Sequence, residues 1–164
     1  MKLRAALVGS VILAAFFLVA QSVAADDRAK LVGIWRLVAL DLEFQDTGER
    51  RPTLGKKPNG YLILTPEGRM MAYLEAENRT PPKTPEEQAA AYRTMFAYTG
   101  KYRLEGDKWV TKVDGSWNVT WVGTDQIRFF KFQGDQLHVV SQWQPSATYG
   151  NRMVRGFVAW EREK

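Results

Sequence analysis

The stretch QIRFFKFQGDQLHVVSQW, residues 126–143, contains the pattern that decides the fold. On each side of Gly134-Asp135, β-branched and aromatic residues alternate with polar ones, which is the period of a strand with one buried face. Gly-Asp between two such runs is a short hairpin-turn signal. The stretch therefore predicts two antiparallel strands, at 126–133 and 136–143.

The same period recurs along most of the chain. Further runs of this kind lie at 33–44, 60–64, 69–75, 101–105, 109–114 and 153–161. Thr65-Pro66-Glu67-Gly68 has proline and glycine where a type I turn prefers them, and Gly106-Asp107 is a second short turn. Six of the eight predicted strands thus pair with a sequence neighbour, which is typical of an antiparallel meander.

One segment departs from the strand period. Thr84-Pro85-Glu86-Glu87 combines an N-cap threonine, a proline at the first helical position and a glutamate at the third. Apolar residues then recur at helical spacings, at Ala89, Tyr92, Met95 and Phe96. With Gly100 as a natural terminator, we expect one helix at about 85–98, inserted between the third and fourth strands.

These elements predict an all-β fold. An eight-stranded antiparallel sheet can remove its exposed edges by closing into an up-and-down barrel. A barrel of eight strands has an interior that side chains just fill, or that holds one small ligand. The alternative is an open sheet packed by the single helix.

The amino-terminal sequence is typical of an export signal. Lys2 and Arg4 precede an apolar segment at 5–20, and Val23 and Ala25 are small residues where a signal peptidase reads them. We expect cleavage after Ala25, leaving one domain at 26–164 in a secreted or periplasmic protein. The alternative, a transmembrane anchor, needs about 20 apolar residues, more than this segment has.

Removal of this segment lowers the net charge of the protein. The 164 residues carry 23 basic and 18 acidic side chains, a formal charge of +5. Residues 1–25 hold two of the bases and no acid, so the remaining 139 residues carry +3. We therefore expect no nucleic-acid partner and no stable membrane insertion after cleavage. The chain has no cysteine, so its core alone must hold the fold.

Three landmarks resemble a known architecture. Gly33-Ile34-Trp35 opens the first strand and Trp160-Glu161-Arg162 closes the last. With the meander between them, they resemble the calycins, in which a Gly-x-Trp near the first strand lies under an arginine near the last. The blocks at 60–69, 97–102 and 121–128 are similar to those of the bacterial and fungal lipocalin-like domain family.

The resemblance implies a lipocalin-like barrel with a ligand-binding interior, and it implies no reaction. It assigns Trp35 and Arg162 a structural role, in which the guanidinium stacks over the indole. Members of the family often have a histidine on the fifth strand, where this chain has Lys112. A mechanism that uses that histidine is therefore not expected here.

Two arginines inside strands are candidates for binding an anion. Arg128 shares a strand face with Phe130 and Phe132, and Arg155 shares one with Met153 and Phe157. An arginine on an apolar face needs an anionic partner, which a bound carboxylate would supply. The alternative is that these arginines face outward or pair with acids of the protein, such as Glu75 or Asp114.

Other candidates for the lining of a pocket are amphipathic or adaptable side chains. The predicted ligand-binding residues are Tyr61, Met70, Tyr73, Tyr98, Tyr102, Arg128, Phe130, Trp143 and Arg155. Ordinary core packing is an equally good interpretation of the tyrosines, of Met70 and of Trp143. His138 is the only histidine, which excludes a multi-histidine metal site, and we expect no cofactor.

Three functions remain open from the sequence. The first is an exported monomer or dimer that binds one small, mostly hydrophobic molecule, either neutral or anionic. The second is an enzyme that isomerises, cyclises or hydrates such a molecule, with a tyrosine or His138 as proton donor. The third is an envelope structural or stress protein with a filled barrel, which would bind a partner through its loops.

Overall fold

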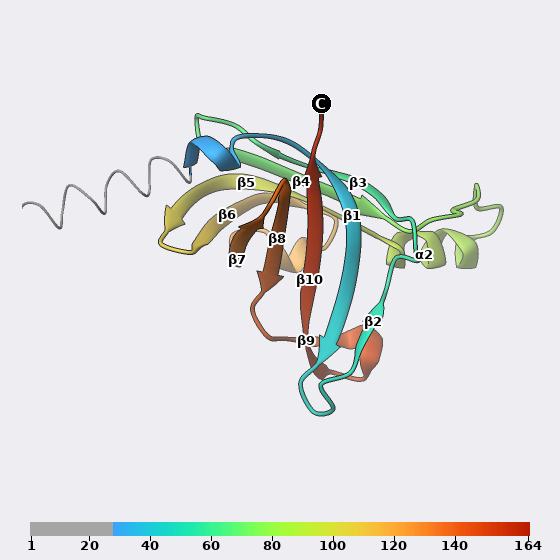
Figure 1. The fold of residues 1–164 in the computed structure, drawn as a ribbon. Coiled ribbons are helices and arrows are strands. Elements are labelled where there is room, and N and C mark those ends of the chain that lie inside the picture. Colours follow the sequence, from blue (N-terminus) through green and yellow to red (C-terminus); the bar gives the residue numbers. More distant parts are fainter. Residues whose placement is uncertain (1–27) are drawn as a thin grey trace, which may run out of the picture. The chain divides into compact units, whose positions relative to one another are not determined.

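The computed structural model describes residues 28–164 (Figure 1). The predicted export signal at 1–25 lies outside the described residues. Residues 28–31 form one helical turn in a first unit, and Gly33–Lys164 make up a second. The second unit contains every strand described below.

The second unit is a sheet of ten strands with one α-helix and two short 3₁₀ helices. The strands are β1 (Gly33–Phe44), β2 (Arg50–Pro52), β3 (Asn59–Leu64), β4 (Arg69–Glu75), β5 (Met95–Glu105), β6 (Lys108–Ser116), β7 (Asp125–Gln133), β8 (Gln136–Ser141), β9 (Gln144–Ser146) and β10 (Arg152–Arg162). The helices are α2 (Pro85–Arg93), η1 (Val119–Trp121) and η2 (Ala147–Tyr149).

Eight of these strands close into an antiparallel barrel, which confirms the predicted fold class. Their order is β1-β3-β4-β5-β6-β7-β8-β10, and β10 pairs with β1 along its length to close the ring. The short strands β2 and β9 lie outside this ring, where they extend the sheet beside the ends of β1 and β10 (Figure 1). Closure leaves no long unpaired edge in the barrel.

Several barrel strands bury alternate residues, as the sequence period predicts. In β3 and β4 the buried side of the pleat carries Leu62, Leu64, Met70, Ala72 and Leu74. β1 departs from strict alternation, because a bulge between Leu37 and Ala39 shifts its register against β10. The bulge puts Leu37 and Leu40, rather than Val38, in the core.

Trp35 and Arg162 have the packing role that the resemblance implies. Trp35 is 2% exposed and lies directly opposite Arg162 in the β1–β10 ladder. The guanidinium carbon of Arg162 is 4.3 Å from the centre of the indole. A Cβ at Gly33 would lie 2.5 Å from Nη1 of Arg162, so the glycine leaves room for the stacked arginine. The glycine of the Gly-x-Trp pattern is therefore explained by the space that Arg162 occupies.

The helix is shorter than predicted. Thr84 is its N-cap and accepts a hydrogen bond from the Glu87 amide at 3.2 Å, but α2 ends at Arg93. Met95 and Phe96 belong to β5, which begins six residues before the predicted 101 and pairs with β4 from Met95 onward. The apolar spacing at 89–96 fits a helix and the end of a strand equally well, and tertiary pairing with β4 decided between them.

No side chain of α2 is buried, so the predicted apolar stripe does not pack against the barrel as a helix face. Tyr92 is half exposed, and its hydroxyl donates to the carbonyl oxygen of Trp117. No helix in the described part of the chain is long and apolar enough to cross a membrane.

Candidate ligand-binding site

The barrel contains a partly open cavity of about 90 Å³. All eight barrel strands contribute to its walls. The lining residues are Leu40, Leu42, Leu62, Ala72, Leu74, Phe96, Tyr98, Trp109, Trp121, Arg128, Val139, Ser141, Gln144, Gly156, Val158 and Trp160. An apolar cavity of about 150 Å³ is enough to bind benzene. The space here is smaller, so a buried group can be at most about one small ring or a short chain.

Aromatic side chains close the barrel on one side of this cavity. Trp35 packs against Phe132, with ring centres 6.1 Å apart, and Phe132 packs against Phe130 at 6.0 Å. Phe130 in turn packs against Trp109, which lines the cavity, at 5.7 Å. These contacts fill the interior between the Trp35 end of the barrel and the cavity, so the barrel is only partly filled.

A second aromatic cluster borders the cavity on the side of η1. Trp121 lies edge to face against Tyr98 at 5.4 Å and against Trp117 at 4.9 Å, and Trp117 contacts Phe96 at 4.9 Å. Asn118 fixes η1 as its N-cap by accepting from the Thr120 amide. The 3₁₀ helix thus holds Trp121 over Tyr98, at the edge of the cavity.

Arg128 lines the cavity and is its only charged lining residue in the described chain. Its guanidinium carbon lies 5.5 Å from the ring of Tyr98 and 5.7 Å from that of Trp121. Its hydrogen bonds go to neutral oxygens, to the Ile127 carbonyl at 2.8 Å and to the Gln126 amide at 3.4 Å. Within residues 28–164, no carboxylate forms a described salt bridge with Arg128. The alternative that it faces outward therefore does not hold.

Tyr98 and Arg128 are the two predicted ligand-binding residues that line the cavity. Tyr61 and Tyr73 instead lie opposite each other on the outer face of β3 and β4. Tyr73 donates to Glu75 at 2.5 Å, and this hydrogen bond raises the pKa of the Tyr73 hydroxyl. In β3 and β4, Leu62 and Met70 are on the buried face. Because successive side chains of a strand point to opposite faces, Tyr61 and Tyr73 point away from the barrel interior.

Met70, Tyr102 and Phe130 point inward but do not line the cavity. Met70 has no exposed surface, and Tyr102 is 6% exposed and donates to the Thr65 carbonyl at 3.0 Å. Phe130 belongs to the aromatic packing that starts at Trp35. For these three residues the structure agrees with the ordinary-core interpretation, because neighbouring side chains fill the space around them.

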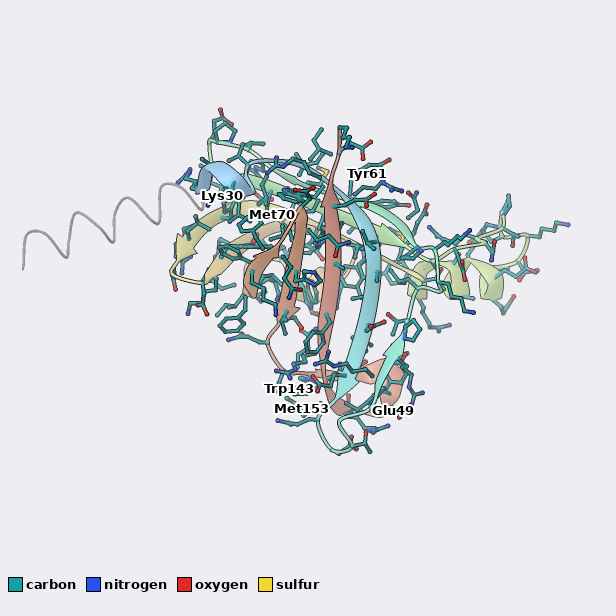
Figure 2. All side chains as sticks on the ribbon, in the orientation of Figure 1. Lys30, Glu49, Tyr61, Met70, Trp143 and Met153 are labelled. Atoms are coloured by element: carbon teal, nitrogen blue, oxygen red, sulfur yellow. The ribbon has the colours of Figure 1, made fainter. Side chains whose placement is uncertain are left out.

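Arg155 and Trp143 lie outside the barrel. Arg155 donates to Glu43 at 2.6 Å, and its guanidinium carbon is 4.5 Å from the Trp143 ring. Figure 2 shows Trp143 and Met153 near the end of β10 where β9 pairs with it. Hydrogen bonding to Arg155 lowers the pKa of Glu43 below its ordinary value of 4.5. Arg155 is therefore paired with an acid of the protein, although with Glu43 rather than Glu75 or Asp114.

His138 also faces outward, because Leu137 and Val139 take the buried side of β8. It does not line the cavity, so it has no place in chemistry there. Among the described residues, no group of three or more potential ligands is arranged to hold a metal ion.

Several cavity residues were not predicted as site residues. Ser141 could have been found, because it shares the inward face of β8 with Leu137 and Val139. Gln144 and Trp121 carry no comparable signal, since β9 and η1 are too short to show a period. Only the folded barrel brings these side chains to the cavity.

The sequence agrees with this architecture when it is compared with known proteins. The family described as "Lipocalin-like domain" matches residues 32–163. No curated protein matches the chain. Because the family match covers all the barrel strands and most of the chain, the protein belongs to the lipocalin-like domain family.

Proposed function

We propose that the protein binds a small, mostly hydrophobic molecule inside its barrel. The observation that carries this proposal is the cavity of about 90 Å³, whose walls are largely aliphatic and aromatic. Binding sites for small molecules combine such apolar walls with a few polar groups that orient the ligand. Here the polar groups include Arg128 of β7, Ser141 of β8 and Gln144 of β9.

The proposal is tested by filling the cavity. Gly156 lines it, and a Cβ there would meet nothing closer than 3.5 Å, the distance to Leu40 Cδ1. Gly156→Leu therefore places a side chain in the cavity, while Gly156→Ala is the matched control. Titration of the purified protein with one-ring and short-chain compounds is followed by tryptophan emission and calorimetry. We expect the wild-type protein and Gly156→Ala to bind, and Gly156→Leu to lose binding.

Two results would contradict the proposal. One is that no compound of either class binds the wild-type protein. The other is that Gly156→Leu, shown by circular dichroism to be folded, binds as tightly as the wild-type protein, because the ligand would then bind elsewhere.

We also propose that the protein works in the periplasm or outside the cell. The support is the basic start, the apolar segment at 5–20 and the small residues before Asp26. The intact mass of the protein recovered from a native-like host is the test. A chain that begins at Asp26 and is found outside the cytoplasm is expected. A full-length chain in the cytoplasm would contradict the proposal.

A further inference from the structure

Three of the residues that bring polar groups to the cavity lie in a row. Trp109 of β6, Arg128 of β7 and Ser141 of β8 are direct neighbours across the two ladders that join these strands. Directly opposite residues project from the same face of a sheet with their Cβ atoms about 5 Å apart. All three residues line the cavity. A ligand in the cavity therefore meets these three side chains together.

Among the described residues, the indole N–H of Trp109 has no hydrogen-bond acceptor, and Arg128 has acceptors for only part of its N–H groups. Trp109 is 1% exposed, and its indole Nε1–H has no hydrogen-bond partner among the described residues. A buried donor without an acceptor is unfavourable, because it has lost its hydrogen bonds to water. Arg128 has five N–H groups and only the two neutral oxygen acceptors described above.

The third member does not supply the missing acceptor. The Ser141 hydroxyl donates to the Gln142 carbonyl at 3.0 Å and accepts from the Gly156 amide at 2.8 Å. The aromatic faces of Tyr98 and Trp121 stabilise the Arg128 cation but offer no lone pair to its N–H groups. The indole N–H of Trp109 and part of the Arg128 guanidinium thus have no acceptor among the described residues.

We propose that the ligand is a small monoanion with an apolar body, and that its carboxylate accepts from Arg128 and from the Trp109 indole. This inference rests on the proposed function and names its ligand class. A carboxylate fits because its two oxygens can accept from the fork of a guanidinium and still reach a third donor. The cavity volume of about 90 Å³ limits the buried apolar body to about one ring or a short chain.

Arg128 and Trp109 then determine specificity by charge. A neutral molecule of the same shape would leave the Arg128 cation and the indole N–H without a strong acceptor. An amine would place a second positive charge beside Arg128. Charge-assisted hydrogen bonds are strong enough that we expect the anion to bind about tenfold or more tightly than the neutral molecule.

The test uses three compounds with the same skeleton and different charges, namely phenylacetate, 2-phenylethanol and 2-phenylethylamine. Calorimetry on the purified protein should give an affinity for phenylacetate at least about tenfold above that for the alcohol. The amine should bind most weakly. The indole NMR signal of Trp109, assigned by its loss in Trp109→Phe, should move further downfield with phenylacetate than with the alcohol.

Variants separate the two donors from the rest of the cavity. Arg128→Met should bind phenylacetate and 2-phenylethanol within about twofold of each other. Arg128→Lys keeps the positive charge but loses the paired N–H groups of the guanidinium. It should retain part of the preference for phenylacetate over 2-phenylethanol. Trp109→Phe should weaken phenylacetate binding more than alcohol binding. Arg155→Met removes an arginine on the outer face and should leave the preference unchanged.

Failure of this inference is distinguishable from failure of the proposed function. Equal affinity of the wild-type protein for the acid and the alcohol would overturn the anion assignment and leave a site for neutral ligands. Binding of none of the three compounds would overturn this inference, and the proposed function would fall with it only if no other one-ring or short-chain compound bound either. The wild-type charge series and the Trp109 signal decide the question even if an Arg128 variant does not fold.

Discussion

At the scale of single residues, the barrel depends on a few large side chains with fixed neighbours. Trp35 is almost fully buried, packs against Phe132 and lies under the guanidinium of Arg162. It lies at the end of the barrel beyond the aromatic packing, and it does not line the cavity. Its contribution should therefore be to stability and not to ligand preference.

Trp35→Ala should lower the free energy of unfolding by about 3–5 kcal/mol, because it leaves a large cavity in the core. Denaturant unfolding measures this loss, and titration with phenylacetate and 2-phenylethanol measures the preference. Tyr61→Ala, on the outer face, is the control for an aromatic side chain removed at the surface. Loss of binding with unchanged unfolding would contradict the structural role of Trp35.

At the scale of elements, hairpin turns and strand periods were predictable because they depend on neighbours in sequence. The turns at Gly106 and Gly134 have positive φ values of 63° and 58°, as tight hairpins require. The end of the helix was not predictable in this way. Whether Met95 and Phe96 continue α2 or begin β5 depends on backbone pairing with β4, which is distant in sequence from β5.

The N-cap of α2 can be tested by substitution. Thr84→Ala removes the N-cap hydrogen bond to Glu87 and should destabilise α2 by about 1 kcal/mol. Because no side chain of α2 is buried, the unfolding midpoint of the barrel should hardly change. Hydrogen exchange of the α2 amides should become faster while that of the barrel strands stays the same. Thr80→Ala, in the preceding loop, is the control, and a clear fall in the barrel's midpoint would show that α2 supports it.

At the scale of the whole molecule, closure joins the first strand to the last. Glu43 of β1 and Arg155 of β10 are direct neighbours in that ladder, and their side chains form an ion pair at 2.6 Å. The pKa of Glu43 is lowered in the folded state, mainly by the hydrogen bond from Arg155. Its charged form therefore stabilises the closed barrel above its unfolded pKa, and this contribution is lost as the pH falls through the folded value.

Glu43→Gln should therefore be less stable than the wild-type protein at neutral pH, and the difference should shrink below the ordinary pKa of 4.5. Denaturant unfolding at neutral pH and at about pH 3 measures both values. Glu163→Gln, an exposed change near the carboxyl terminus, is the control. A stability difference that stays constant across this range would show that the Glu43 charge does not contribute.

The sequence by itself determined the class of fold, the turns, the start of the helix and the pairing of Trp35 with Arg162. The first three follow from local period, turn chemistry and helix capping, and the pairing of Trp35 with Arg162 is what the resemblance to the lipocalin-like family implied. The sequence did not determine which of two similar arginines meets the cavity. Arg128 and Arg155 both lie on strands beside aromatic residues, and parity tells which residues share a face without telling which face is enclosed. In the closed barrel, Arg128 faces the cavity and Arg155 faces outward, where it pairs with Glu43. The two faces of the sheet become an interior and an exterior only when the first and last strands pair, so the sequence pattern of a single strand could not decide between these arginines.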